Sequence, residues 1–209
     1  MTSEFEQLAM QEQQMETMVA KDPLLEQIEE LFPTRDKVVS AVEKAFRSGE
    51  SHPSCDSIVD RLPDESQKWQ TLAPVELAKN PKGNRVMIFE PRIQKGVFTV
   101  NIRYSGSENL MVFLDKSKPR EFVITRIAAN SVEVGFPSIS EIDYKSADSL
   151  ENIKKVLIPT LEVFESRIMA MNAKIMQRRY ELNEDIEMAI KAREAAINQQ
   201  RQFEAYLND

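Results

Sequence analysis

His52 and Cys55 are the first residues whose types and spacing could support chemistry. They are the single histidine and the single cysteine of this 209-residue chain, and they lie in the polar segment SHPSCD. A thiolate beside an imidazole is the nucleophile of several enzyme classes. One such pair in a loop is more simply explained by chance, and a lone cysteine builds neither a disulfide framework nor a Cys-rich zinc site. We therefore expect no catalytic residue and no metal.

Glu184, Asp185 and Glu187 form a second group, which could bind a cation or transfer protons. In a helix these carboxylates would spread around an exposed arc, with Lys191 and Arg193 close enough to pair with them. A solvated helix face is the simpler explanation. The chain also has only five glycines. Phosphate-binding enzymes often hold their ligands with glycine-rich loops, and this chain offers little material for such a loop. The sequence predicts no enzyme and no cofactor.

Basic side chains gather in the middle of the chain and suggest nucleic-acid binding. The net charge is -9 for residues 1–66, +4 for residues 67–145 and -2 for residues 146–209. Small sheets with basic loops and exposed aromatics do bind single strands. Against this, the total charge of -7 opposes attraction to phosphates, and strand alternation puts most of the aromatics in the core. Nucleic-acid binding is the alternative hypothesis, with these candidate contacts: Arg92, Lys95, Lys116 and Lys118.

The composition indicates a globular protein. Hydrophobic residues make up 42% of the chain and charged residues 29%, which is enough apolar material for a core. The apolar runs are far shorter than the roughly 20 residues that a membrane span needs. The N-terminus is acidic and polar, unlike a secretory signal. We expect a cytoplasmic protein, or one of a virion or host cytoplasm if viral, without membrane contact.

Residues 1–80 read as an N-terminal region of short helices. A capping box of Ser3 and Glu6 predicts a first helix over about residues 4–20. Asp22 followed by Pro23 starts a second helix. Thr34 can cap a third, which ends before Gly49. Its predicted buried residues are Val38, Val39, Val42, Ala45 and Phe46.

Residues 81–145 read as a β region. Five runs, at about 85–90, 96–104, 109–115, 120–128 and 131–136, are rich in β-branched and aromatic residues and are separated by short turns. Short connections favour antiparallel neighbours. The fold class is therefore α+β, with a central five-stranded antiparallel sheet or small barrel.

Residues 146–209 read as one long amphipathic C-terminal helix, a coiled-coil or bundle element. Pro159 should kink this helix or divide it in two. Beyond Pro159 a seven-residue step meets apolar residues up to Phe203, although a second column fails at Arg178 and Asp185. The predicted partner-facing residues are Leu161, Phe164, Ile168, Met171, Ile175, Leu182, Ile186, Ala189, Ile190, Ala196, Ile197 and Phe203.

A long helix with an apolar stripe needs a partner, because an isolated helix gains little stability from propensity alone. Three partners are open: the first helix of the same chain, another copy of the chain in a homo-oligomer, or a different protein. Without a catalytic constellation, the leading hypothesis is a non-enzymatic assembly or interaction protein. Scaffolds, assembly chaperones and structural components of a phage or another large complex belong to this class.

Overall fold

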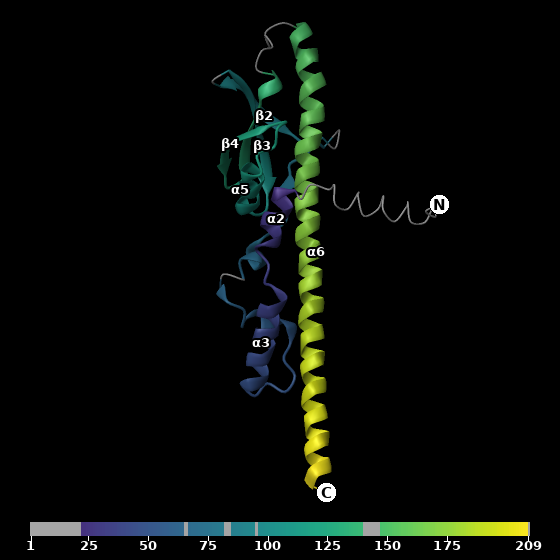
Figure 1. Cartoon of the computed structure of the whole chain (residues 1–209). Helices are drawn as coiled ribbons and strands as arrows, with labels where there is room; N and C mark the ends of the chain where they lie inside the picture. The colour runs from purple at the N-terminus through teal and green to yellow at the C-terminus, as the bar shows by residue number, and fades with distance from the viewer. Residues whose placement is uncertain (1–21, 65–66, 82–84, 95, 140–146, 209) are drawn as a thin grey trace, which may run out of the picture.

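In the computed structural model the chain is an α+β protein arranged along one long helix. The structure describes residues 22–64, 67–81, 85–94, 96–139 and 147–208. The long helix, α6 (Ala147–Asn208), has the sheet beside its N-terminal half and α3 beside its C-terminal half, as Figure 1 shows. The predicted fold class and the long C-terminal helix are confirmed.

The region before the sheet consists of short helices. They are α2 (Pro23–Glu29), α3 (Arg35–Arg47), α4 (Cys55–Val59) and the 3-10 helix η2 (Lys68–Thr71). Asp22 caps α2 as predicted, because its carboxylate accepts a hydrogen bond from the Leu24 N–H at 3.0 Å. The predicted helix over residues 4–20 lies outside the described residues. Val39 was predicted to be buried, but it is 44% exposed on α3.

The five strands form an open antiparallel sheet and do not close into a barrel. They are β1 (Glu76–Leu77), β2 (Ile88–Gln94), β3 (Val97–Ser105), β4 (Val123–Ala128) and β5 (Ser131–Phe136). β5 lies between β3 and β4, while β1 and β2 both pair with β3. The predicted runs near 85–90, 96–104, 120–128 and 131–136 correspond to β2, β3, β4 and β5.

The predicted strand over residues 109–115 is wrong, because this segment is the helix α5 (Glu108–Lys116). Ser107 stands at its N-cap position, and Leu110, Met111 and Leu114 are buried along one helical face. The run of apolar residues has the composition of a strand but the spacing of a helix. The fifth strand of the sheet is β1. It has only two residues and lies in a segment that is not rich in β-branched or aromatic residues.

One face of the sheet is apolar and packs on helices α5 and α6. This inner face carries alternate residues of β3 and β5, which are all buried: Phe98, Val100, Ile102, Tyr104, Val132, Val134 and Phe136. The Phe122 ring, just before β4, meets the Phe164 ring of α6 edge to face at 5.0 Å between centroids. The buried side chains of the short helices, the sheet and α6 belong to one core.

α6 continues through Pro159 as one helix, so the predicted alternative of a division in two is wrong. Pro159 is exposed and lacks the N–H that would reach the carbonyl of Lys155, so the helix loses one hydrogen bond there. The hydroxyl of Thr160 donates to the carbonyl of Val156 at 2.9 Å in the same turn. Buried side chains on both sides of the proline, from Leu157 to Phe164, hold the two segments on one core.

Candidate interaction surfaces

The apolar stripe of α6 is covered by its own chain over most of its length. Six of the twelve residues predicted to face a partner are buried, and they are Phe164, Ile168, Met171, Ile175, Leu182 and Ile186. Three more are half-buried against the same core, namely Leu161, Ala189 and Ile190. α6 contacts α2, α3, α4, α5 and the 3-10 helix η3 (Pro137–Ile139), so these nine side chains pack within the chain.

Polar contacts fix α6 in this position. The amide of Asn172 makes two hydrogen bonds with the backbone of Val75, and the guanidinium of Arg179 donates to the carbonyl of Leu72 at 2.6 Å. Lys79, which follows β1, forms an ion pair with Glu165. These contacts join the middle of α6 to the segment that leads into the sheet.

The acidic N-terminal region pairs with basic residues of α6. The three ion pairs are Asp22 with Arg167 at 3.4 Å, Glu29 with Lys174 at 3.7 Å and Glu43 with Arg193 at 3.3 Å. The three bases are spaced along α6 in the same order as their acids along the chain. The helices α2 and α3 are therefore aligned with α6 over about 26 residues, or roughly 40 Å.

Beyond this contact α6 extends past the rest of the described chain. Figure 1 shows its C-terminal end running on beyond α3. We call residues 196–208 the free end. Phe203, Tyr206 and Leu207 lie on it with 62%, 80% and 65% of their surface exposed. Of the predicted partner-facing residues, Ala196 and Phe203 are exposed here and Ile197 is half-buried.

An apolar groove lies between α3 and α6 immediately before the free end. It encloses about 260 Å³, and its apolar lining consists of Val39, Val42, Met188, Ala189, Ala192 and Ala196. Arg35, Glu43, Asp185 and Arg193 are the charged residues around it. Met188 is 51% exposed, so the groove offers apolar surface that the described chain leaves open to solvent. We call it the α3–α6 groove.

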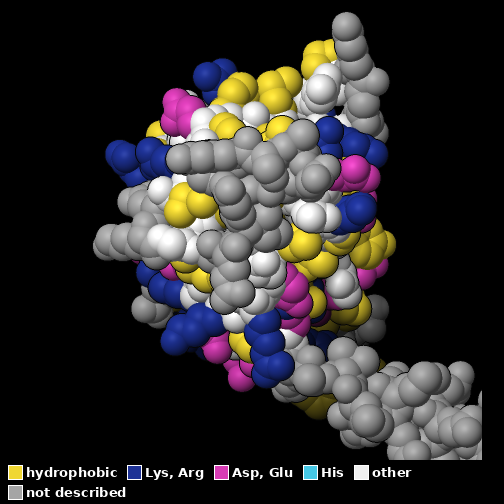
Figure 2. Space-filling view, turned by 90° about the horizontal axis from the view of Figure 1, so that it is seen from above, with side chains coloured by type: hydrophobic (Ala, Val, Ile, Leu, Met, Phe, Trp, Pro, Cys, Tyr) yellow, Lys and Arg dark blue, Asp and Glu magenta, His cyan; other side chains and the backbone are white. Residues whose placement is uncertain are grey.

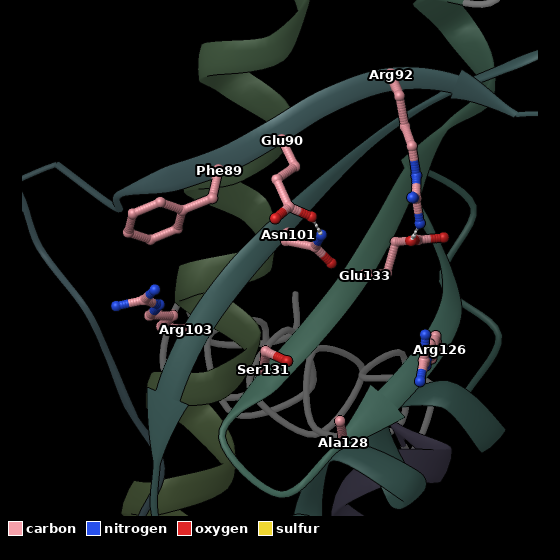
Figure 3. Close-up of a pocket in the computed structure, with 9 residues that line it drawn as sticks. All are labelled: Phe89, Glu90, Arg92, Asn101, Arg103, Arg126, Ala128, Ser131 and Glu133. Carbon is pink, nitrogen blue, oxygen red and sulfur yellow. Dashed lines mark hydrogen bonds and ion pairs between the residues drawn. The ribbon is translucent and has the colours of Figure 1, made fainter.

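The outer face of the sheet forms a separate polar hollow of about 460 Å³, drawn in Figure 3. Its residues come from β2, β3, β4 and β5. Glu133 is 4% exposed, and it accepts hydrogen bonds from Arg92 and from the hydroxyl of Thr125. The Arg103 guanidinium lies over the Phe89 ring, 4.6 Å from its centroid.

Electrostatics in this hollow centre on Glu133. Burial by itself raises the pKa of this carboxyl, but the hydrogen bonds from Thr125 and Arg92, together with the charges of Arg92 and Arg126, outweigh burial and lower the pKa below its usual value. Glu133 is therefore an ionised group in a charge pair. The arrangement links β2, β4 and β5 through Arg92, Thr125 and Glu133.

Comparisons of the chain with protein-family models, curated proteins and solved structures find no match. Function therefore has to be argued from the molecule itself. Among the described residues there is no helix that is both long and apolar enough to span a membrane. Within the same residues no three metal-ligating side chains of His, Cys, Asp or Glu gather into a group.

The basic residues proposed for nucleic acid do not share one surface. Arg92 lies on the outer face of the sheet and is bound to Glu133. Lys116 and Lys118 lie at the end of α5, which packs on the inner face. Lys95 is outside the described residues. Figure 2 shows basic side chains separated by apolar and acidic ones on the face that it presents.

His52, Cys55 and Glu187 are among the residues considered for chemistry. His52 Nδ1 lies 3.0 Å from a carboxylate oxygen of Glu194 on α6. Burial, followed by the charges of Glu187 and Asp56, raises the pKa of the Cys55 thiol, which disfavours the nucleophilic thiolate. Glu187 pairs with Lys191 at 3.4 Å. Glu184 and Glu187 are exposed as expected, whereas Asp185 is half-buried at the α3–α6 groove and Arg193 pairs with Glu43 instead.

Two features of these surfaces were missed in the sequence. The α3–α6 groove was missed because Val39 was assigned to the core. The polar hollow on the outer face of the sheet could have been found from two signals. The alternation of β3 puts Arg103 on the face away from the buried Ile102, and in β5 Glu133 stands between two buried valines. Tyr206 and Leu207 stand near Phe203 at helical spacing, so they could have been included with it.

Proposed function

We propose that the protein is a non-enzymatic assembly protein, a scaffold, assembly chaperone or structural component, which joins copies of itself through the C-terminal part of α6. The observation that carries this proposal is the free end. There Phe203, Tyr206 and Leu207 are exposed at helical spacing, and no described part of the chain lies against them.

The free end requires a partner for two physical reasons. The free end continues α6, but its last turns carry exposed apolar side chains, and helix ends without tertiary packing fray. Burial of a Phe or Leu side chain contributes about 1.5–3 kcal/mol, and in this chain that gain is not realised at the free end. A second copy that covers these residues supplies both effects.

The position of the buried stripe restricts where a partner can bind. Residues 164–186 of the stripe are occupied by the same chain, so a partner that needed them would first have to displace α2 and α3. The α3–α6 groove and the free end are contiguous through Ala196. Together they form one continuous apolar surface on α6 that can be covered without unfolding the body.

The test is solution mass, measured by light scattering after size exclusion on the full chain. We expect an oligomer that dissociates when the three exposed residues are changed together in a F203S/Y206S/L207S variant. The matched control changes three exposed apolar residues on another face of α6, in a M169S/M176S/Y180S variant, and should leave the mass unchanged. A monomeric wild type, or loss of the oligomer in the control alone, would overturn the proposal.

Truncation at Pro159 is unsuitable for this test. It would remove Phe164, Ile168, Met171 and Ile175, which are core residues, so the remaining chain would lose its fold together with any interface. Substitutions at the exposed end change the interface and leave the core intact.

Nucleic-acid binding through the outer face of the sheet is a second candidate. Arg103 and Arg126 line the hollow beside Arg92, and no carboxylate is bound to either of them among the described residues. This function predicts retardation of single-stranded DNA or RNA at low salt, weakened in a R103E/R126E variant. Absence of retardation by the wild type at low salt would remove it.

A further inference from the structure

We infer that the partner of the free end is a second copy bound antiparallel, with a two-fold axis between residues 197 and 198 of the two α6 helices. This inference rests on the proposed function and specifies its geometry. It follows from the order in which small and large residues occur along one face of α6.

The face in question follows a four-three spacing. Its residues, in order, are Asp185, Ala189, Ala192, Ala196, Gln199, Phe203 and Tyr206. This spacing places them on one stripe of a helix, as in the contact positions of a coiled coil. The first half of the stripe offers alanines, and the last two positions offer aromatic rings.

An antiparallel arrangement places the alanines of each stripe opposite the aromatic residues of the other. With the axis between residues 197 and 198, Ala192 lies opposite Phe203 of the second copy. By the same register Ala189 lies opposite Tyr206, and Leu207 reaches the level of Met188. A parallel pair would instead set Phe203 on Phe203 and alanine on alanine, which crowds one end and leaves gaps at the other.

The α3–α6 groove completes the site for the incoming end. Val39 and Met188 form its apolar walls around Ala192. Phe203 and Leu207 of the second copy reach this level of α6, so they enter the groove and cover its exposed apolar surface.

The contact area agrees with a reversible dimer. The paired segments run from Met188 to Leu207, which is about 30 Å of helix at 1.5 Å per residue. Two helices in contact over this length, with α3 beside them, bury on the order of 1,200 Å² in total, which is the low end for specific interfaces. Assembly should therefore depend on protein concentration.

Spin-label distances test the direction of pairing in full-length protein carrying C55S. With a label at E184C on each copy, the antiparallel register predicts a separation of about 40 Å, because residue 184 is about 13 residues from the axis. A parallel pair predicts less than about 25 Å. A dimer with the short distance would overturn the antiparallel inference but leave the proposed function, whereas a monomer would overturn both.

A size-exchange experiment tests the register. A192F places two large residues opposite each other, and F203A places two small ones, so each variant should raise the dimer dissociation constant at least about tenfold. The double variant A192F/F203A restores one large and one small residue in each layer. We expect it to recover most of the wild-type affinity. Additive losses in the double variant would overturn the register.

Discussion

The side-chain amide of Asn172 on α6 makes two hydrogen bonds with the backbone of Val75, accepting from its N–H at 2.9 Å and donating to its carbonyl at 2.8 Å. Val75 is buried and immediately precedes β1 at the edge of the sheet. The Asn172 side chain thus makes the two hydrogen bonds that a neighbouring strand would make. It satisfies the N–H and the carbonyl of Val75 where the sheet ends. This contact couples the position of α6 to the edge of the sheet.

Removal of this amide should destabilise the fold. In Asn172→Ala the N–H and carbonyl of Val75 lose their partners in a buried segment, and each such loss costs about 1–3 kcal/mol. We expect the free energy of unfolding to fall by about 2–4 kcal/mol in urea denaturation. Asn183→Ala is the matched control, because Asn183 is exposed on the same helix and the gain in helix propensity is equal. Equal stabilities of the two variants would contradict the role of Asn172.

The two ends of the α6 stripe should respond differently to the same substitution. Phe164 is fully buried against Phe122, so Phe164→Ala should cost about 3–5 kcal/mol of stability. Phe203 is exposed in one chain, so Phe203→Ala should change the stability of dilute monomer by less than about 0.5 kcal/mol. The measurement is urea unfolding at a protein concentration where the wild type is monomeric. A large loss for Phe203→Ala would show that the free end packs on its own chain.

The sequence predicted the elements whose signals are local. The cap and proline of α2, the glycine after α3 and the alternation of β3 are properties of a few neighbouring residues, and these elements lie where expected. α5 was missed because Leu110 to Leu114 form a short apolar run, for which helix and strand patterns overlap. β1 was missed because it is held by backbone pairing with β3, which its own two residues do not reveal.

The candidate surfaces were harder to predict for a different reason. An apolar stripe shows that a helix face is covered, but it does not show by what. The structure divides the stripe beyond Arg193, between a part that packs on α2 and α3 and a part that extends past them. That division depends on the length of α3 and on the ion pairs of Arg167, Lys174 and Arg193, which are long-range contacts.

Pro159 is a position where stability can be gained. It lies inside α6, is exposed and leaves the carbonyl of Lys155 without its helical donor. Pro159→Ala supplies the missing N–H donor, and alanine is a better helix former than proline. We therefore expect the free energy of unfolding to rise by about 1–3 kcal/mol. Thermal and urea unfolding measure the gain. A loss of stability would mean that the fold depends on the altered geometry at the proline.

The Glu133 charge pair should make stability depend on pH. Because the pKa of Glu133 is lowered in the folded protein, its contribution is fully present above the unfolded value of about 4.3 and is lost as pH falls through the folded value. Glu133→Gln should cost about 1–3 kcal/mol at pH 7, with the difference from wild type shrinking toward pH 3. Thr125→Val, which removes one hydrogen bond to this carboxylate, should show a smaller effect of the same sign. A pH-independent difference for Glu133→Gln would contradict the assignment.

Hydrogen exchange should distinguish the covered part of α6 from the free end. Amides of residues 168–186 lie on the core and should exchange slowly at every protein concentration. Residues 199–207 are all exposed in a single chain, so their amides should exchange within seconds when the protein is dilute. At concentrations that favour the dimer their exchange should slow at least about tenfold, because opening then requires dissociation. The F203S/Y206S/L207S variant should show fast exchange of this segment at both concentrations. Slow exchange of residues 199–207 in dilute wild type, or no change with concentration, would argue against assembly through the free end.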